Sequence, residues 1–256
     1  MHHNFLFDLD QTLLDFHASE KVALELVLKA HGLSWSEDIY THFKAYNKQL
    51  WLELEKGTIS RTELFTLRFN DIIERSGGAD RGIDPLQMNT EFIQTMSENG
   101  VLMDGAMELI QRIHRDIADA RIYIITNGAT VNARGRIEST GLKPYIEGLY
   151  VSDAMGVAKP AVEYFDMCLG WIGEPKESCI VIGDSLSSDM QGAKNAGLTS
   201  VWFMPEGDIE AIKSAYRISY TASSYDELYE ILKAWAETTV KEGNEGAAYT
   251  QNAEGS

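Results

Sequence analysis

The stretch Phe5-Leu6-Phe7-Asp8-Leu9-Asp10-Gln11-Thr12 begins with three apolar residues and then places two aspartates one residue apart. A short apolar run of this kind is typical of a buried strand. Side chains at positions i and i+2 of an extended segment share one face, so we expect Asp8 and Asp10 to point the same way. Two neighbouring carboxylates repel each other, and that cost indicates a bound cation or a reaction. The alternative is a strand end at the surface with a solvated acidic turn.

Two further apolar runs end in polar residues, as the first one does. One is followed by Thr126-Asn127-Gly128 and the other by Gly183-Asp184-Ser185, with Asp189 five residues after Asp184. After about residue 100, such runs alternate with helical patterns, which is typical of a parallel sheet covered by helices on both faces. Ligands of these α/β sheets bind beyond the carboxyl ends of the strands. We therefore expect the three polar segments to converge in space.

The apolar pattern also divides the chain into domains. From Ser19 to about Glu98 it is helical, with four expected helices and no strand. The sequence therefore predicts a Rossmann-like core formed by residues 1–16 and 100–236, and an all-helical domain inserted at residues 17–99. Residues 237–256 are rich in Glu, Gly, Asn, Thr and Ala and nearly lack aliphatic side chains, which predicts a disordered tail.

Composition excludes several classes of function. The net charge of −17 argues against a protein that tracks a nucleic-acid backbone, because such binding needs clustered Lys and Arg. No apolar stretch approaches the roughly 20 residues of a membrane span, and no secretory signal is recognisable. We expect a cytoplasmic protein with no membrane or nucleic-acid partner. A monomer and a homodimer are both compatible with the sequence.

In their order along the chain, these polar segments resemble the four motifs of the haloacid dehalogenase (HAD) phosphohydrolase superfamily. The motif residues are Asp8 and Asp10, Thr126, Lys159, and Asp184 with Asp189. The resemblance covers essentially the whole chain before the tail, and the inserted helices match the helical cap of the family. It implies a phosphoryl-transfer enzyme, because the dehalogenases proper lack an acid at the position of Asp10.

The resemblance also implies roles for the two N-terminal aspartates. Asp8 would attack phosphorus and form an aspartyl-phosphate, and Asp10 would protonate the leaving group and later accept a proton from water. The cofactor would be Mg²⁺, which suits an all-oxygen shell. Its ligands would be the Asp8 carboxylate, the main-chain carbonyl of Asp10, and Asp184. Asp189 would bind through water or orient its neighbours.

The phosphate group would be held by the second and third motifs. By resemblance, Thr126 would donate a hydrogen bond to a phosphate oxygen, helped by the main-chain N–H groups of Asn127 and Gly128. Lys159 would neutralise the phosphate and hold Asp8 in place. Pro160 directly follows this lysine and is expected to begin a helix, which would fix how the lysine enters the site.

The inserted helices suggest a substrate. The segment from Asn47 to Gly57, followed by Arg68-Phe69, is similar to the house-cleaning pyrimidine 5′-nucleotidase branch of the superfamily. That branch dephosphorylates nucleoside monophosphates such as UMP, dUMP and dTMP. Trp51 or Phe69 could stack on a base; the alternative is that both are core residues between cap helices, since aromatic side chains at helical spacing usually pack. Arg68 could pair with phosphate or sugar, or form a surface ion pair.

Two other interpretations stay open at this point. One keeps the reaction machinery and makes the protein a phosphatase or phosphomutase that acts on sugar phosphates or other small metabolites. The other is a non-catalytic binding protein that retains the HAD fold, since a fold alone does not establish an activity.

Overall fold

The structure, a computed structural model, describes residues 2–205 and 207–251, and it divides the chain into two compact units. One unit, the core unit, consists of Met1–Asp15 and Leu102–Ser256. The other, the cap unit, is Phe16–Val101. The boundaries expected from the sequence, 16/17 and 99/100, compare with 15/16 and 101/102 in the structure.

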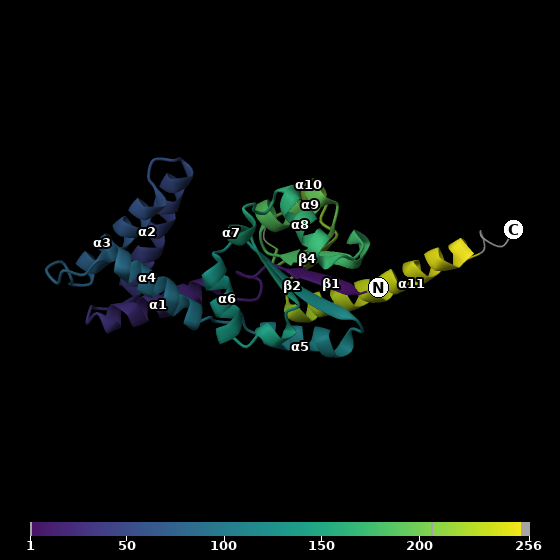
Figure 1. Ribbon diagram of the computed structural model, residues 1–256, viewed down its shortest axis with the longest axis horizontal. Coiled ribbons are helices and arrows are strands. Elements are labelled where there is room, and N and C mark those ends of the chain that lie inside the picture. The colour runs from purple at the N-terminus through teal and green to yellow at the C-terminus, as the bar shows by residue number, and fades with distance from the viewer. Residues whose placement is uncertain (1, 206, 252–256) are drawn as a thin grey trace. The chain divides into compact units, whose positions relative to one another are not determined.

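The core unit is built on a six-stranded parallel sheet with strand order β3-β2-β1-β4-β5-β6 (Figure 1). The predicted Rossmann-like fold class is therefore confirmed. The strand order reverses direction next to β1, which is the position where doubly wound sheets bind their ligands. The strands are β1 (His3–Phe7), β2 (Ala120–Thr126), β3 (Gly148–Val151), β4 (Cys179–Gly183), β5 (Thr199–Phe203) and β6 (Tyr220–Ala222).

Both faces of the sheet are covered because side chains of each strand alternate between them. On one face, Phe5 and Phe7 of β1 pack in a cluster with residues of three helices, α5, α6 and α11. On the other face, Leu6 packs with Phe165 of α8 and Ala193 of α9. The helices and short turns of this unit are α5 (Ala106–Asp116), α6 (Thr130–Ser139), η1 (Lys143–Tyr145), α7 (Ser152–Met155), α8 (Val162–Ile172), η2 (Lys176–Ser178), η3 (Leu186–Met190), α9 (Gln191–Ala196), α10 (Ile209–Tyr216) and α11 (Tyr225–Gln251).

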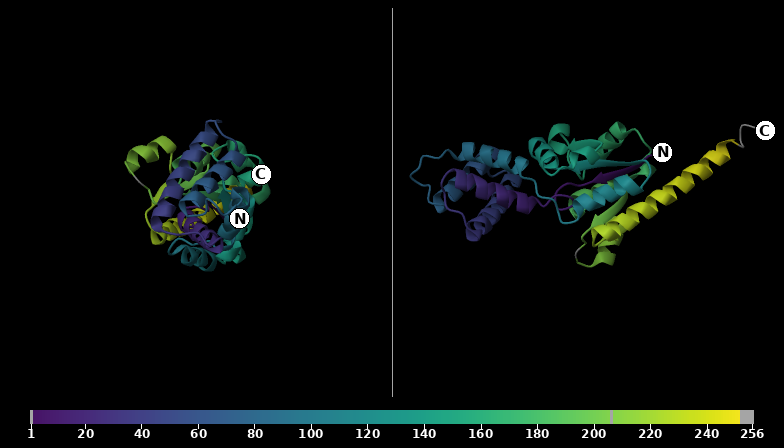
Figure 2. Two further views of the ribbon diagram at one scale, coloured as in Figure 1. Left: turned by 90° about the vertical axis from the view of Figure 1, so that its left-hand side faces the viewer. Right: turned by 90° about the horizontal axis from the view of Figure 1, so that it is seen from below.

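The cap unit contains the four predicted helices, which form a bundle of their own (Figure 2). They are α1 (Phe16–Ala30), α2 (Glu37–Glu55), α3 (Arg61–Arg75) and α4 (Pro85–Glu98). Ser60 and Glu63 form a complete capping box at the start of α3, so both N-terminal amide groups that these side chains reach are satisfied. Phe43, Phe69 and Phe92 meet at the centre of the bundle, with ring centroids 5.5–5.9 Å apart.

The C-terminal end differs from the sequence-based expectation. The predicted disordered tail begins at residue 237, whereas α11 continues to Gln251. Helix nucleation is the costly step, and the packed residues at the start of α11 have already nucleated this helix. Residues 252–256 of the predicted tail lie outside the described part of the chain.

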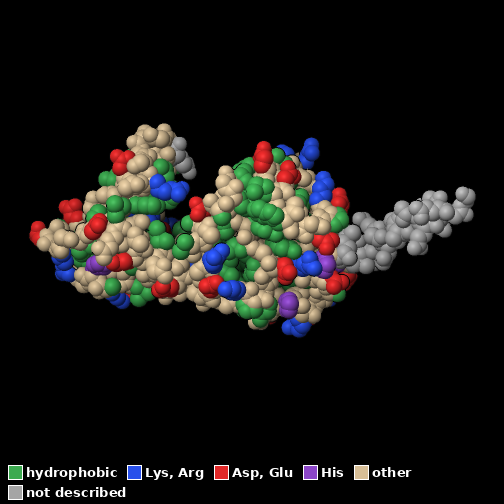
Figure 3. All heavy atoms as spheres, viewed as in Figure 1, with side chains coloured by type: hydrophobic (Ala, Val, Ile, Leu, Met, Phe, Trp, Pro, Cys, Tyr) green, Lys and Arg blue, Asp and Glu red, His purple; other side chains and the backbone are tan. Residues whose placement is uncertain are grey.

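The described residues have three further features, in their helices and at their surface. Within the described residues, no helix has both the length and the apolar character that crossing a membrane requires. Apolar side chains also form a band across the face of the core unit shown in Figure 3. Separately, Trp171 of α8 is among the exposed apolar side chains, and its ring lies 5.3 Å from that of Tyr150.

Candidate active site

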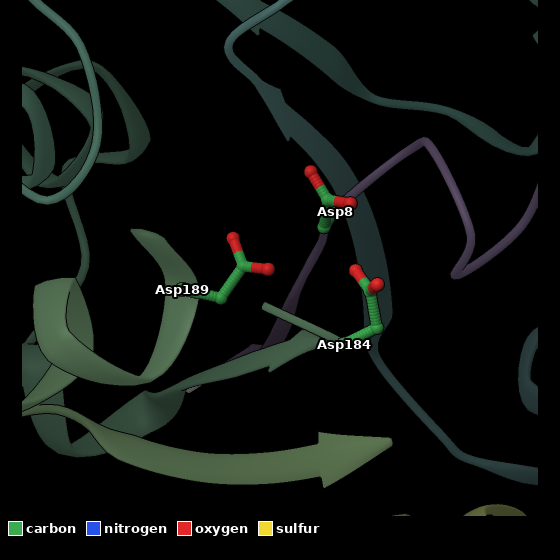
Figure 4. A group of neighbouring side chains, drawn as sticks. All are labelled: Asp8, Asp184 and Asp189. Carbon is green, nitrogen blue, oxygen red and sulfur yellow. The ribbon is translucent and has the colours of Figure 1, made fainter. Parts of the chain in front are cut away.

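Asp8, Asp184 and Asp189 come together at the carboxyl ends of β1 and β4. The two strands are neighbours, with Phe7 opposite Ile182, so the residues that follow each strand emerge side by side. The N–H of Asp8 still donates to Ile182 O, at 2.8 Å, which extends the ladder to the aspartate itself. Asp189 enters from the η3 turn, and the three carboxylates face a common space (Figure 4). One oxygen from each lies within 4.8 Å of the others. We call these residues the carboxylate trio.

Lys159 connects two members of the trio. Its side chain is only 1% exposed, and its Nζ donates to Asp8 Oδ1 and Asp189 Oδ1, each at 2.6 Å. A third hydrogen bond reaches Ile125 O at 2.9 Å, which uses all three ammonium hydrogens. Burial alone would lower the pKa of Lys159, but the charges of Asp189 and Asp8 raise it, so the side chain stays an ammonium.

The trio carries more negative charge than Lys159 can balance. When all three carboxylates are ionised, one ammonium leaves two of their negative charges uncompensated, at a site where Asp8 and Asp189 are buried and Asp184 is partly buried. Burial and the charge of Asp189 raise the pKa of Asp184 to about 6. Burial also raises the pKa of Asp8, against the opposing effect of Lys159. These raised pKa values describe a site that is short of positive charge. A divalent cation with an all-oxygen shell would supply that charge, so the donor set fits Mg²⁺.

The main chain of Lys159 is held by the side chain of Asn127. Asn127 Oδ1 accepts from the N–H of Lys159, and its Nδ2 donates to the carbonyl of the same residue, both at 2.9 Å. The expectation that Pro160 begins a helix and so directs the lysine is wrong, because α8 begins only at Val162. The sequence predicts a phosphate contact for the main chain of Asn127. It gives no sign that the Asn127 side chain clamps the lysine.

Thr126 and Gly128 lie at the end of β2, in the loop expected to hold phosphate. Thr126 is buried, and its Oγ1 accepts a hydrogen bond from the N–H of Gly128 at 3.1 Å. A Cβ at Gly128 would lie 3.4 Å from that Oγ1 and 4.0 Å from Asp10 Oδ2. The carboxylate of Asp10 therefore faces this loop, and the absence of a side chain at Gly128 keeps the space between them open.

Asp10 lies outside the trio and has its own cation. Arg136 Nη2 donates to Asp10 Oδ2 at 3.1 Å, and Nη1 donates to Oδ1. Arg136 is not among the site residues expected from the sequence. A signal for it does exist in the sequence, because Ala133, Arg136 and Ile137 share the buried stripe of α6, where a charged residue is unusual.

The main chain around Asp184 is also fixed by contacts that the sequence does not reveal. Trp202 of β5 donates its indole N–H to Asp184 O at 3.0 Å. The N–H of Ser185 donates to Asp189 Oδ2 at 3.2 Å. A Cβ at Gly183 would lie only 2.3 Å from Asp189 Oδ2. Asp189 can therefore approach the trio only because residue 183 is glycine.

The residues expected to contact substrate from the cap have different surroundings. Trp51 is 37% exposed, and Phe69 is fully buried in the aromatic centre of the bundle. Arg68 is buried rather than part of a surface ion pair, and it donates to the Oδ1 atoms of Asn47 and Asn89, at 3.2 Å to Asn47. In this structure Phe69 therefore packs rather than stacks on a ligand, which is the second of the two interpretations that the sequence left open.

Comparison with known proteins gives consistent matches over most of the chain. A family model described as haloacid dehalogenase-like hydrolase matches residues 3–197. The pyrimidine 5′-nucleotidase PynA of Streptococcus pneumoniae is 34% identical over 228 residues, which are 89% of this chain and 93% of that protein. The pyrimidine 5′-nucleotidase YjjG of Escherichia coli is 32% identical over 233 residues, 88% of this chain and 96% of that protein.

A solved structure matches the fold as well. It is the magnesium-bound HAD-hydrolase YfnB of Bacillus subtilis, with a TM-score of 0.74 and 30% sequence identity. The match covers 90% of this chain and 98% of that one.

Proposed function

The chain belongs to the haloacid dehalogenase-like hydrolases and is a HAD-type phosphatase, and from that premise we propose that it is a Mg²⁺-dependent 5′-nucleotidase acting on pyrimidine nucleoside monophosphates. The observation that carries the reaction type is the contact of one buried lysine with two carboxylates at the mouth of the sheet. The substrate class rests on the relatives and on the resemblance of the cap segment.

Asp8 is the proposed nucleophile. Lys159 donates to Asp8 Oδ1 and thereby holds that oxygen, and the second oxygen is the one we assign to attack phosphorus. The bond between phosphorus and the ester oxygen breaks as the aspartyl-phosphate forms. Water then attacks the same phosphorus, the bond to Asp8 breaks, and inorganic phosphate leaves.

Asp10 is the proposed proton carrier. Its carboxyl group gives a proton to the departing ester oxygen in the first step, and it accepts a proton from the attacking water in the second. The side chain is 28% exposed and faces the loop of Thr126 and Gly128, where we place the phosphate. In this proposal Thr126 Oγ1 and the N–H of Asn127 donate to the phosphate, and Lys159 neutralises its charge. The N–H of Gly128, which donates to Thr126 Oγ1 in this structure, would turn to the phosphate when it binds.

The carboxylate trio, with the main-chain carbonyl of Asp10, would hold Mg²⁺. The ion supplies positive charge that lets an anionic nucleophile approach an anionic phosphate. A like-charge pair about 4 Å apart costs roughly 4 kcal/mol at an effective dielectric near 20. The uncompensated carboxylate charges of the trio therefore require added positive charge at this position. Lys159 supplies one of the positive charges that the trio requires.

A substrate panel tests the proposal. Phosphate release is measured from UMP, dUMP, dTMP and CMP. AMP, GMP, ribose 5-phosphate and glucose 1-phosphate are tested in the same way as alternative substrates. We expect the pyrimidine nucleotides to give the highest kcat/KM. Release of phosphate from sugar phosphates but from no nucleotide would contradict the nucleotide assignment and make the protein a sugar phosphatase. Conversion of glucose 1-phosphate to the 6-phosphate without phosphate release would make the protein a mutase.

The Asp8→Asn variant tests the nucleophile. An amide cannot form the aspartyl-phosphate, so we expect kcat to fall by about 10³-fold or more with an unchanged circular dichroism spectrum. The matched control is Asp166→Asn, an exposed acid on α8, which should keep the rate of the unmodified protein. A folded Asp8→Asn protein that still turns over at that rate would contradict the assignment.

A further inference from the structure

Arg136 is a charged side chain in the protein interior, where burying a charge is energetically costly. Among the residues whose burial the structure describes, it is the largest fully buried side chain, and 1% of it is exposed. It lies on α6, with Ala133 and Ile137 on the same buried stripe. An arginine cannot lose its proton in a protein, so it stays charged there. Burying it requires a well-placed anion, and the structure supplies Asp10.

The contact between the two side chains has two points. Nη1 donates to Asp10 Oδ1, and Nη2 donates to Oδ2 at 3.1 Å, so the planar guanidinium lies against the planar carboxylate. Two parallel hydrogen bonds fix the rotation of a carboxylate as well as its distance, which a single lysine contact cannot do. Each carboxylate oxygen has two acceptor sites, so this fork leaves one on each oxygen for proton transfer.

The elements on either side of this contact are themselves fixed. The turn after β1 closes with the N–H of Gln11 donating to Leu14 O at 2.8 Å, which sets the main chain next to Asp10. At the other end, Asp153 Oδ2 accepts from the N–H of Thr130 at 3.4 Å and holds the start of α6. The orientation of Asp10 therefore follows from two rigid elements joined through Arg136.

We propose that Arg136 is a positioning residue that holds the Asp10 carboxyl group toward the phosphate loop for proton transfer. The inference rests on the proposed function, since it takes Asp10 to be the proton carrier. The charges near the site support a dedicated role. Lys159 serves Asp8 and Asp189, whereas Arg136 contacts the acid to which we assign proton transfer. The two cations thus serve the nucleophile and the proton carrier separately.

The test compares two esters that differ in their need for a proton. The alkoxide that leaves UMP must be protonated as it departs, whereas p-nitrophenolate is a weak base and leaves without a proton. In Arg136→Gln we expect kcat for UMP to fall by about 10²-fold, the size of a typical acid–base contribution, with KM changed less than about 3-fold. The pre-steady-state burst of p-nitrophenolate, which reports formation of the aspartyl-phosphate alone, should keep its rate within about 2-fold.

Matched variants separate positioning from a structural role. Arg134→Gln changes an exposed arginine on the same helix and should behave like the unmodified protein. Arg136→Lys keeps the charge but loses the fork, so its kcat for UMP should lie between those of the unmodified protein and Arg136→Gln. In the Asp10→Asn background, Arg136→Gln should cause no further loss of kcat.

Several outcomes would overturn the proposal. They are an equal loss for both esters, an undiminished kcat for UMP in Arg136→Gln, and a further full loss in the Asp10→Asn background. If Arg136→Gln does not fold, as judged by circular dichroism, the same comparison of UMP with the p-nitrophenyl ester in Arg136→Lys tests the proposal. If UMP is not a substrate of the unmodified protein, the comparison uses whichever alkyl phosphate the panel identifies. A wrong nucleotide assignment therefore does not count against Arg136.

Discussion

Gly183 shows how a single missing side chain shapes the site. It ends β4 directly before Asp184, and the space that a Cβ would occupy is filled by the carboxylate of Asp189. Asp189 can lie beside Lys159 only because nothing projects from residue 183. A Cβ essentially never lies within 3.0 Å of a non-bonded heavy atom, so a larger residue must displace the carboxylate.

We therefore expect Gly183→Ala to move Asp189 and weaken its ion pair with Lys159. Small displacements of groups that position a nucleophile are costly, and we expect kcat to fall by about 10-fold or more, together with a lower Tm. The control is Gly170→Ala within α8, where a Cβ would meet no atom within 4 Å. That variant should gain roughly 0.5–1 kcal/mol of stability and keep its activity. Equal activity in both variants would contradict this account of Gly183.

The sequence predicted part of the site but not the contacts that hold it together. Asp8, Asp184 and Asp189 converge as expected, because the carboxyl ends of neighbouring parallel strands must meet. Arg136 and Gly183 were missed because their importance depends on which distant atom lies against them. That information comes from the packing of α6 and η3 and is not contained in any local pattern.

Among the elements, α3 places a buried charge inside the cap bundle. Arg68 is surrounded by aromatic rings, and its guanidinium lies 5.0–5.3 Å from the ring centroids of Phe65, Phe69 and Phe92. Its hydrogen bonds go to Asn47 and Asn89, on α2 and α4. Burial lowers the pKa of Arg68 to about 10, which still leaves it charged at neutral pH. It therefore joins three helices through polar contacts within an apolar bundle.

Replacing Arg68 with methionine should destabilise the cap unit. The variant keeps much of the side-chain volume but leaves the Oδ1 atoms of two buried asparagines without these donors, at about 1–3 kcal/mol for each such group. We expect the free energy of unfolding, measured with urea, to fall by about 3 kcal/mol. Arg75→Met is the matched control on the same helix. Its ion pair with Asp71 is at the surface and should contribute less than about 1 kcal/mol. A similar effect of both variants would show that the buried contacts add little.

Secondary structure followed from the sequence where the apolar pattern was strong. The buried strands β1 and β4 are short, continuous apolar runs, and the cap helices carry apolar residues at helical spacing. The sequence did not predict the helical conformation of the end of α11, because composition reports the conformational preference of an isolated segment. A segment attached to a helix that is already packed is extended from a nucleus and does not need to form one.

Considering the whole molecule, the carboxylate trio draws on the first strand and on a segment about 180 residues later, so only the folded protein assembles it. A ligand that binds the native state but not the unfolded chain raises the stability of the protein. Mg²⁺ at about 100 times its Kd should add about 2.7 kcal/mol. For a chain of this size, this corresponds to a Tm increase of roughly 5–10 °C.

The measurement is a thermal melt with and without Mg²⁺. EDTA should remove both the shift and the activity, and added Mg²⁺ should restore them. Asp184→Asn should abolish the shift, because it removes one of the proposed ligands, whereas the exposed acid variant Asp166→Asn should retain it. A shift that persists in Asp184→Asn would place the ion elsewhere.

The position of β1 in the sheet also has a consequence for synthesis of the chain. This strand is made first, yet it lies between β2 and β4, and the latter begins only at Cys179. Until the ribosome has released that segment, β1 can have a neighbour on one side only, and its other edge carries unpaired N–H and C=O groups. A nascent or truncated chain that ends before Cys179 thus exposes the apolar strand that precedes Asp8, and such fragments should associate with one another or recruit chaperones.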